Sequence, residues 1–328
     1  MKFAVVGAGA IGAFAGALLS RAGNDVTLIA RGANLKTIRE RGVRIHGGIG
    51  EITAHPSATD NIADVGAVDV VLLATKAHSL TEIAPQLAPL FGPQTAVIPA
   101  QNGIPWWYFY RHGGELEGLH LESVDPGSVI EKHIEPSRVI GCVVYVASVI
   151  IAPGVIRHEE GTRFSLGEPD GSKSDRCRAI SESFIRAGMK SPVRTDIRHE
   201  IWVKLMGNVA FNPISALSRA TLLEIVSCPE TRALSADIMR ECESLAKKLG
   251  IDLAVTIEQR IAGAEKVGHH KTSMLQDVEA GKVLELEPMV GAIVELGERL
   301  GVPTPYTRTV YACAKLLNEK LKPRPAGS

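Results

Sequence analysis

A lysine and two asparagines stand at four-residue intervals in the segment 202–213, WVKLMGNVAFNP. Each helical residue turns by about 100°, so Lys204, Asn208 and Asn212 would lie along one face of a helix. Apolar neighbours lower the pKa of a lysine towards neutrality, which suits it to proton transfer, and amides orient a ligand without titrating. The alternative is a solvated lysine beside two surface or helix-capping asparagines. The segment alone does not decide between these interpretations.

A glycine-rich turn near the N-terminus has the context of a dinucleotide-binding site. The segments Lys2–Val6 and Asp25–Ile29 predict two buried strands, and an Ala/Leu-rich stretch between them predicts a helix. The residues that join the first strand to this helix are Gly7, Ala8, Gly9, Ala10, Ile11 and Gly12. The three glycines permit the bend, the approach of a pyrophosphate, and close packing of helix and strand, in that order. The helix N-terminus adds N–H donors for phosphates, so the segment predicts a Rossmann-type domain.

The residue after the second strand indicates which dinucleotide is bound. NAD-selective sites usually have an acidic residue near this position, whereas this chain has Arg31. An arginine there can pair with the 2′-phosphate of NADP(H). The alternative is an exposed loop arginine without a ligand. We therefore expect NADP(H) as the cofactor.

Two more polar residues mark the ends of predicted strands. Lys76 ends the apolar segment Val68–Lys76, and Asn102 ends Thr95–Asn102. Ligands bind at the carboxyl ends of strands in open α/β sheets, so both residues are predicted to line the site. The aromatic segment Pro105–Tyr110 follows, and its favoured interpretation is local packing, with a substrate lid as the alternative.

The pattern changes to helical periodicity in the second half of the chain. Before that change, strands are predicted at Val139–Val149, Gly154–His158 and Arg163–Leu166, and a helix at Asp175–Ala187. After it, helices are predicted at Ile197–Phe211, Pro229–Leu249, Leu253–Lys266, Glu285–Leu300 and Thr304–Leu321. We therefore predict an α/β domain over residues 1–195 and a helical domain over residues 196–328, with a frayed tail at 322–328.

The helical half holds a second group of polar residues. Ser273 precedes a short helical stretch, and its structural interpretation is a helix cap. Glu285 is equally consistent with an ordinary acidic residue in a first helical turn. Neither residue is diagnostic by itself.

Composition and charge exclude several classes of partner. The chain of 328 residues has 36 Lys+Arg against 36 Asp+Glu and no basic cluster among aromatics, which argues against nucleic acid and membrane surfaces. No apolar run is long enough for a membrane span. The five scattered cysteines are typical of a reduced cytoplasmic protein, and no metal-ligand spacing is present, so we expect no metal. The oligomeric state stays open, with a homodimer as one alternative.

Taken in order, the motifs resemble those of the ketopantoate reductases (2-dehydropantoate 2-reductases) over nearly the whole chain. They are Gly7–Gly12, Thr75-Lys76-Ala77, Gln101-Asn102-Gly103, Trp202–Pro213, Thr272–Asp277 and the segment around Glu285. The resemblance implies a Rossmann domain followed by an all-α domain similar to the C-terminal domain of 6-phosphogluconate dehydrogenase. It also implies a site in the cleft between these domains.

The resemblance implies a reaction and a role for each residue. NADPH would deliver a hydride to the ketone of a small-molecule 2-oxo acid while Lys204 donates a proton. The leading substrate would be 2-dehydropantoate, which is reduced to pantoate in pantothenate biosynthesis. The other implied roles are substrate binding by Asn208, Asn212 and Ser273, cofactor contact by Lys76, and contacts to both ligands by Asn102 and Glu285. Glu285 is also a candidate catalytic residue beside Lys204.

The chain departs from the family pattern near the implied substrate. Leu284–Glu287 and Met289–Gly291 replace the usual Thr-Glu-Ile-Asp and Ile-Asn-Gly, and a third asparagine is missing near Thr221. A reductase or opine-type dehydrogenase for a different, bulkier 2-oxo acid is therefore an alternative. A non-catalytic NADP-sensing protein is an alternative from another class, and the retention of Lys204 with Glu285 argues against it.

Overall fold

The computed structural model describes residues 1–322, which divide into two compact units. The Rossmann unit comprises Met1–Gln101, Pro105–His120 and Asp125–Arg198. The helical unit comprises Asn102–Ile104, Leu121–Val124 and the chain from His199 onward. The predicted tail at 322–328 lies, apart from Lys322, outside the described residues.

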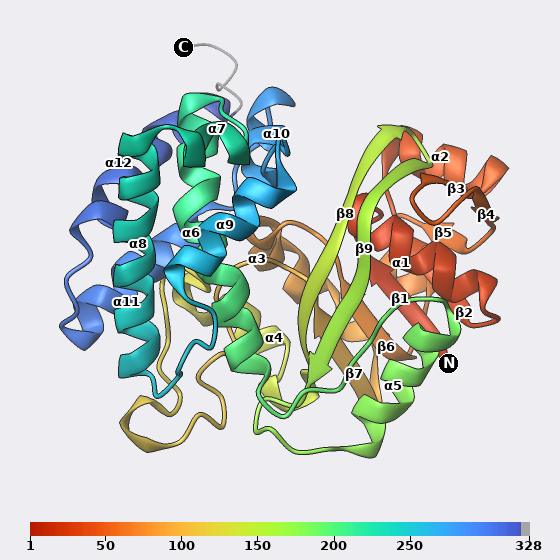
Figure 1. Cartoon of the computed structure of the whole chain (residues 1–328). Coiled ribbons are helices and arrows are strands. Elements are labelled where there is room, and N and C mark those ends of the chain that lie inside the picture. Colours follow the sequence, from red (N-terminus) through yellow and green to blue (C-terminus); the bar gives the residue numbers. More distant parts are fainter. Residues whose placement is uncertain (323–328) are drawn as a thin grey trace, which may run out of the picture. The chain divides into compact units, whose positions relative to one another are not determined.

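The Rossmann unit is built on a five-stranded parallel sheet in the order β5-β2-β1-β6-β7 (Figure 1). Its strands are β1 (Lys2–Val6), β2 (Asp25–Ile29), β5 (Ser57–Thr59), β6 (Val68–Leu73) and β7 (Phe91–Pro99). Val6 at the end of β1 is in register with Ile29 of β2 and with Leu73 of β6. The carboxyl ends of these strands therefore meet at one edge of the sheet, where the glycine turn begins. The α/β prediction is confirmed, and the predicted bounds of β1 and β2 are those observed.

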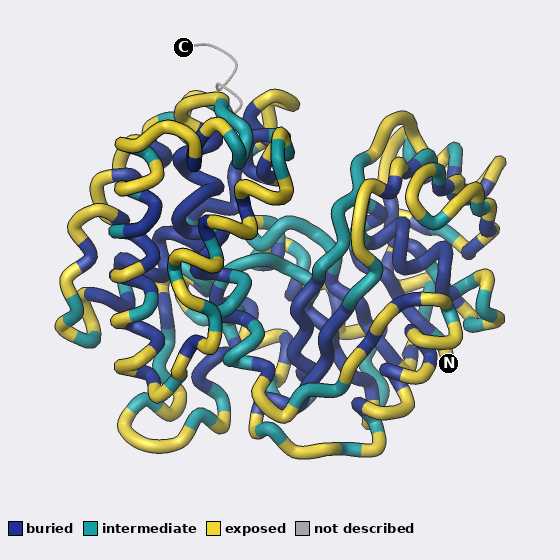
Figure 2. Tube along the Cα trace, in the orientation of Figure 1, coloured by how far each residue is buried: buried dark blue, intermediate teal, exposed yellow. Residues whose placement is uncertain are grey.

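Successive side chains of β1 point to opposite faces of the sheet and enter two separate cores. The central strands of the sheet are buried (Figure 2). Phe3 and Val5 belong to the core that also takes side chains from α1 (Ala10–Arg21) and α5 (Asp175–Arg186). Ala4 belongs to the core on the opposite side of the sheet. Burial of apolar surface on both faces makes the sheet a stable platform for the turns at its edge.

A second sheet of the same unit has the order β4-β3-β9-β8. Its strands are β3 (Val43–Gly47), β4 (Ile52–Ala54), β8 (Gly141–Ala152) and β9 (Val155–Gly167), and the unit's other helices are α2 (Gly32–Arg41), α3 (Leu80–Ile83) and α4 (Val129–His133). The two strands predicted at 154–158 and 163–166 are one strand, so this prediction was wrong. Gly161 lies between them with φ +73°, and the pairing register shifts at Ala147 opposite. The strand therefore continues through a bulge.

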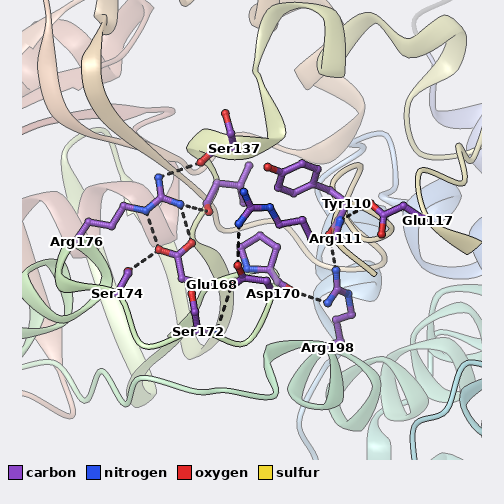
Figure 3. A network of polar contacts seen from close by, with 12 residues as sticks. Tyr110, Arg111, Glu117, Ser137, Glu168, Asp170, Ser172, Ser174, Arg176 and Arg198 are labelled. Carbon is purple, nitrogen blue, oxygen red and sulfur yellow. Dashed lines mark hydrogen bonds and ion pairs between the residues drawn. The ribbon is translucent and has the colours of Figure 1, made fainter. Parts of the chain in front are cut away.

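Two arginines hold the residues that directly follow β9 (Figure 3). Arg176 lies in α5, and Arg198 lies in the first turn of α6 (Ile197–Ser218). Arg176 holds the buried carboxylate of Glu168 with two hydrogen bonds of 2.6 and 2.7 Å. Arg198 donates to the carbonyl oxygen of Tyr108 at 2.8 Å, and burial lowers the pKa of its guanidinium from the ordinary value. The charge-assisted bond of Arg198 fixes the start of α6, whereas those of Arg176 fasten α5 to the residue after β9.

The aromatic segment Pro105–Tyr110 is largely a packing element. Trp107, Tyr108 and Phe109 are at most 2% exposed. Tyr108 and Phe109 also contact each other edge to face, with ring centroids 4.8 Å apart. This burial supports local packing over a mobile substrate lid.

The helical unit contains the remaining helices and a π-helical turn (Figure 1). They are α6 (Ile197–Ser218), α7 (Leu222–Ser227), α8 (Pro229–Lys248), α9 (Ile257–Val267), α10 (Ser273–Glu279), η8 (Glu287–Gly291), α11 (Ala292–Leu300) and α12 (Pro305–Leu321). The predicted change to helical structure in the second half is confirmed. Within residues 1–322, no helix has both the length and the apolar character needed to cross a membrane.

Several elements of this unit differ from the prediction, and one of them, α9, begins at Ile257 rather than at the predicted Leu253. α6 does not end at Phe211 but continues through Pro213 to Ser218. The proline removes only one N–H donor from the helix, and the residues on either side of it stay buried. α7 was not predicted, because a helix of six residues shows little periodicity in the sequence. A capping box at Thr221 defines its start. The helix predicted over Glu285–Leu300 is the π turn η8 followed by α11, with Glu285 on the chain before them.

Candidate active-site residues

Two glycines of the turn after β1 are required by contacts within the protein. Gly7 has φ +102°, and the N–H groups of Gly7 and Ala8 both donate to the Ile29 carbonyl oxygen at 3.2 Å. A Cβ on Gly7 would lie 2.7 Å from Thr75 Cγ2. A Cβ on Gly12 would lie 2.0 Å from the Gly7 carbonyl oxygen. Any other residue at either position would displace the turn.

Gly9, by contrast, has room for a side chain. It is the N-cap of α1, and a Cβ there would meet only the Ala74 carbonyl oxygen, at 3.9 Å. α1 has no side-chain cap and no acidic residue in its first turn. The N–H groups of Ala10 and Ile11 therefore have no partner inside the helix and lie at the positive end of its dipole. This arrangement suits a phosphate or pyrophosphate.

The start of α2 is fastened to the glycine turn. Asn34 donates to the Ala8 carbonyl oxygen and accepts from the Gly154 N–H, both at 2.7 Å. Arg31 is the N-cap of α2, and its exposed guanidinium makes no hydrogen bond or ion pair with the described part of the chain. An arginine without a protein partner beside a phosphate-binding turn is available to a ligand anion. Sequence reasoning missed Asn34, because no pattern distinguishes an amide within a helix's first turn.

The residues after β6 and β7 lie on loops at the same edge of the sheet. The strand predicted to reach Lys76 ends at Leu73, and Lys76 is a half-buried N-cap of the short turn η2 (Ala77–Ser79). Gln101 follows β7 and donates its Nε2 to the carbonyl oxygens of Leu73 and Thr75, both at 3.0 Å. Sequence reasoning assigned no role to Gln101.

The predicted polar face of α6 carries a half-buried lysine with a specific partner. Lys204 Nζ donates to Asn102 Oδ1 at 2.7 Å, and both residues belong to the helical unit. The structure thus brings together Lys204, which the helical spacing indicated, and Asn102, which was predicted at the end of a strand. An amide acceptor orients the ammonium without neutralising its charge. This geometry disfavours the interpretation of Lys204 as a solvated surface residue.

The two asparagines of this face differ in burial. Asn212 is 6% exposed, and its Nδ2 lies 3.8 Å from the Sδ of Met289 in η8. A thioether is only a weak acceptor. Asn208 is half-buried. Both asparagines remain predicted substrate ligands.

Ser273 does not cap α10. The cap is Thr272, whose Oγ1 accepts from the Leu275 N–H at 3.2 Å, whereas Ser273 is the first helical residue and is exposed. The capping interpretation of Ser273 was wrong, because two adjacent hydroxyl residues fit the same sequence signal. Glu285 is 6% exposed and precedes η8, so it is not a first-turn acid.

The loop that carries Asn102 is held to the helical unit at two points. The Ile104 N–H donates to the Pro288 carbonyl oxygen at 2.8 Å. Further along the loop, Ser123 donates to Glu295 through its N–H and its Oγ, at 2.9 and 2.7 Å. Burial raises the pKa of the Glu295 carboxyl, but the hydrogen bonds from Ser123, the Glu122 N–H and Arg299 together hold that pKa below its usual range. The position of Asn102 is therefore fixed within the helical unit.

Comparison with known proteins gives family matches to both halves of the chain. The model described as "Ketopantoate reductase PanE/ApbA" matches residues 3–171, and "Ketopantoate reductase PanE/ApbA C terminal" matches residues 196–318. A 2-dehydropantoate 2-reductase of Mesorhizobium japonicum is 48% identical over 318 residues, which cover 97% of this chain and 98% of the relative.

Two solved structures extend the likeness to the fold. A protein of Ralstonia solanacearum described as a ketopantoate reductase has a TM-score of 0.92 and 38% identity, with 98% of each chain covered. A PanE/ApbA family ketopantoate reductase of Ralstonia eutropha has a TM-score of 0.84 and 27% identity, covering 98% of this chain and 99% of that one.

Proposed function

The chain belongs to the ketopantoate reductase family, a family of oxidoreductases, and we propose that it uses NADPH to reduce a 2-oxo acid to a 2-hydroxy acid. The leading substrate is 2-dehydropantoate. The observation that carries the proposal is the 2.7 Å hydrogen bond from Lys204 Nζ to Asn102 Oδ1, because it gives a candidate acid a fixed direction.

In this proposal Lys204 is the general acid. When bound, NADPH supplies the hydride that reduces the ketone carbon. Lys204 donates a proton to the ketone oxygen as negative charge develops there, and Asn102 holds the ammonium in place. The cationic side chain also favours a negatively charged 2-oxo acid.

The remaining residues are assigned to binding. The glycine turn and the first turn of α1 are assigned to the pyrophosphate, since the N–H groups of that first helical turn face no acidic residue or side-chain cap. We assign Arg31 to the 2′-phosphate, Lys76, Asn102 and Glu285 to the cofactor, and Asn208, Asn212, Ser273 and Asn102 to the substrate, with Glu285 near the substrate hydroxyls.

A bulkier or more apolar 2-oxo acid is the second candidate substrate. Met289 lies 3.8 Å from Asn212, so a thioether borders one of the proposed substrate amides. The neighbouring Val290 is fully buried where the family pattern usually has an asparagine. Comparing turnover of 2-dehydropantoate with that of branched and aromatic 2-oxo acids would decide between the candidates.

Loss of NADPH absorbance in the presence of a panel of 2-oxo acids tests the proposed reaction. We expect oxidation of NADPH that depends on the 2-oxo acid, with 2-dehydropantoate as the best substrate. NADPH binding without turnover of any panel member would reject the enzyme and leave the NADP-sensing alternative.

Replacement of Arg31 by alanine is expected to weaken NADPH binding by roughly tenfold or more, since it removes charge-assisted hydrogen bonds to a phosphate. Binding of NADH, which lacks the 2′-phosphate, should change little. Dissociation constants for both dinucleotides provide the measurement. Arg41→Ala, at the other end of α2 and also exposed, is the control. Equal losses for NADPH and NADH would contradict the assignment of Arg31.

We also keep the domain division after residue 195 and a cytoplasmic location as parts of the proposal. The family matches to residues 3–171 and 196–318 support the division. All five cysteines are free, and three of them are buried, which supports a reducing compartment.

A further inference from the structure

We infer that Gln101 is a positioning residue, which holds the loop after β6 against the phosphate-binding glycine turn. The inference rests on the proposed function. It concerns a residue that touches no reacting atom and acts through the backbone of its neighbours.

The Gln101 side chain fastens the loop after β6. Its Nε2 donates to the carbonyl oxygens of Leu73 and Thr75, both at 3.0 Å, so one amide group holds both sides of the turn at Ala74. The orientation of the amide is defined, because only its nitrogen can donate to two carbonyls. Its Oε1 is buried and has no hydrogen-bond partner among the described residues, so Gln101 acts through its donors.

The fastened loop is in direct contact with the glycine turn. A Cβ on Gly7 would lie 2.8 Å from the Thr75 nitrogen and 2.7 Å from its Cγ2. The Ala74 N–H also donates to the Val6 carbonyl oxygen at 2.9 Å, immediately before the turn. Because there is no spare space, a shift of the Thr75 backbone would move Gly7 and the phosphate-binding turn with it.

Through its side chain, Gln101 therefore constrains the loop after β6 and, with it, the glycine turn that is proposed to bind the dinucleotide. Loss of its two donors is expected to impair dinucleotide binding and turnover together. A residue that only stabilised the fold would lower the melting temperature and leave both unchanged.

Gln101→Glu and Gln101→Met separate these roles. Gln101→Glu keeps the shape of the side chain but places an ionised carboxylate against two carbonyl oxygens. Gln101→Met removes the N–H donors without adding a charge. At about pH 8 we expect Gln101→Glu to weaken NADPH binding by roughly tenfold or more and to lower kcat, with a smaller effect for Gln101→Met. The facing carbonyls raise the pKa of the introduced carboxyl above its usual value of about 4.3, so its protonated form becomes a donor as the pH falls.

Affinity for NADPH, kcat, KM and melting temperature are measured between about pH 5 and 8. Relative to wild type at each pH, Gln101→Glu should recover NADPH affinity as the pH is lowered, whereas Gln101→Met should not. Gln86→Glu is the control, because Gln86 makes a similar 2.9 Å bond to the Glu82 carbonyl oxygen at an exposed site.

Each outcome is decisive for the inference. Wild-type affinity and kcat in both folded variants, or losses that do not depend on pH in Gln101→Glu, would overturn it. If Gln101→Glu does not fold, reduced NADPH affinity and kcat in Gln101→Met support the inference. Failure of both variants to fold would make Gln101 a folding residue and overturn it. Failure of the proposed function is distinguishable, since it would show as wild-type protein that does not turn over a 2-oxo acid.

Discussion

Replacing Lys204 by alanine is expected to lower turnover by roughly 10²-fold or more, as removal of a general acid does. The half-buried ammonium is held by Asn102 Oδ1 at 2.7 Å, so water cannot readily reproduce its position. NADPH binding should stay close to that of wild type, since Lys204 is assigned to the substrate. The measurements are kcat at saturating substrate and the dissociation constant for NADPH.

Lys271→Ala is the matched control for this prediction. Lys271 belongs to the same unit, is exposed, and pairs with Glu279 at 2.7 Å, so its loss should leave kcat unchanged. Near-wild-type kcat in Lys204→Ala would show that another group protonates the product. Loss of NADPH binding in the same variant would place Lys204 on the cofactor instead.

Replacement of Gly9 by alanine is expected to weaken NADPH binding without unfolding the protein. The added Cβ would meet protein only at 3.9 Å, and Gly9 has φ −71°, which alanine adopts freely. Folding stability should therefore change by no more than about 1 kcal/mol, as for an exposed cap position. The methyl group would occupy the space that the pyrophosphate needs, so affinity should fall by roughly tenfold or more.

Gly12→Ala provides the contrast for Gly9→Ala. Its Cβ would lie 2.0 Å from the Gly7 carbonyl oxygen, which cannot yield without opening the turn. We expect Gly12→Ala to lower the melting temperature strongly, whereas Gly9→Ala should keep that of wild type. Unchanged NADPH affinity in a folded Gly9→Ala protein would show that the pyrophosphate does not approach this turn.

The predicted elements agree with the structure where the sequence signal lies in neighbouring residues. The apolar run of Lys2–Val6 and the glycine spacing at 7–12 depend on neighbouring residues, and the structure has β1, the turn and α1 there. The four-residue spacing of Lys204 and Asn208 likewise depends only on helical geometry, and both lie on α6. The approach of Asn102 to Lys204 was not given by either local pattern and needed the fold.

The predictions that were wrong or missing concern features that depend on contacts between distant residues, or on a choice between neighbouring residues of the same chemical type. The continuity of β9 through Gly161 depends on a bulge opposite β8, which no single strand pattern reveals. Thr272 rather than Ser273 caps α10, and both carry a hydroxyl, so composition cannot separate them. The bonds of Asn34 and Gln101 join segments that are far apart in the sequence, and only the three-dimensional structure brings them together.

The helical unit is not a transferable module, because part of it lies early in the chain. Cutting after Arg198 would leave Lys204 without Asn102 and would strip Glu295 of the donors on Ser123. A chimaera that joins this Rossmann half to the helical half of a relative would therefore combine loops and helices that were not selected together. Such an exchange is expected to need residues 102–104 and 121–124 from the same parent as the chain from 199 onward.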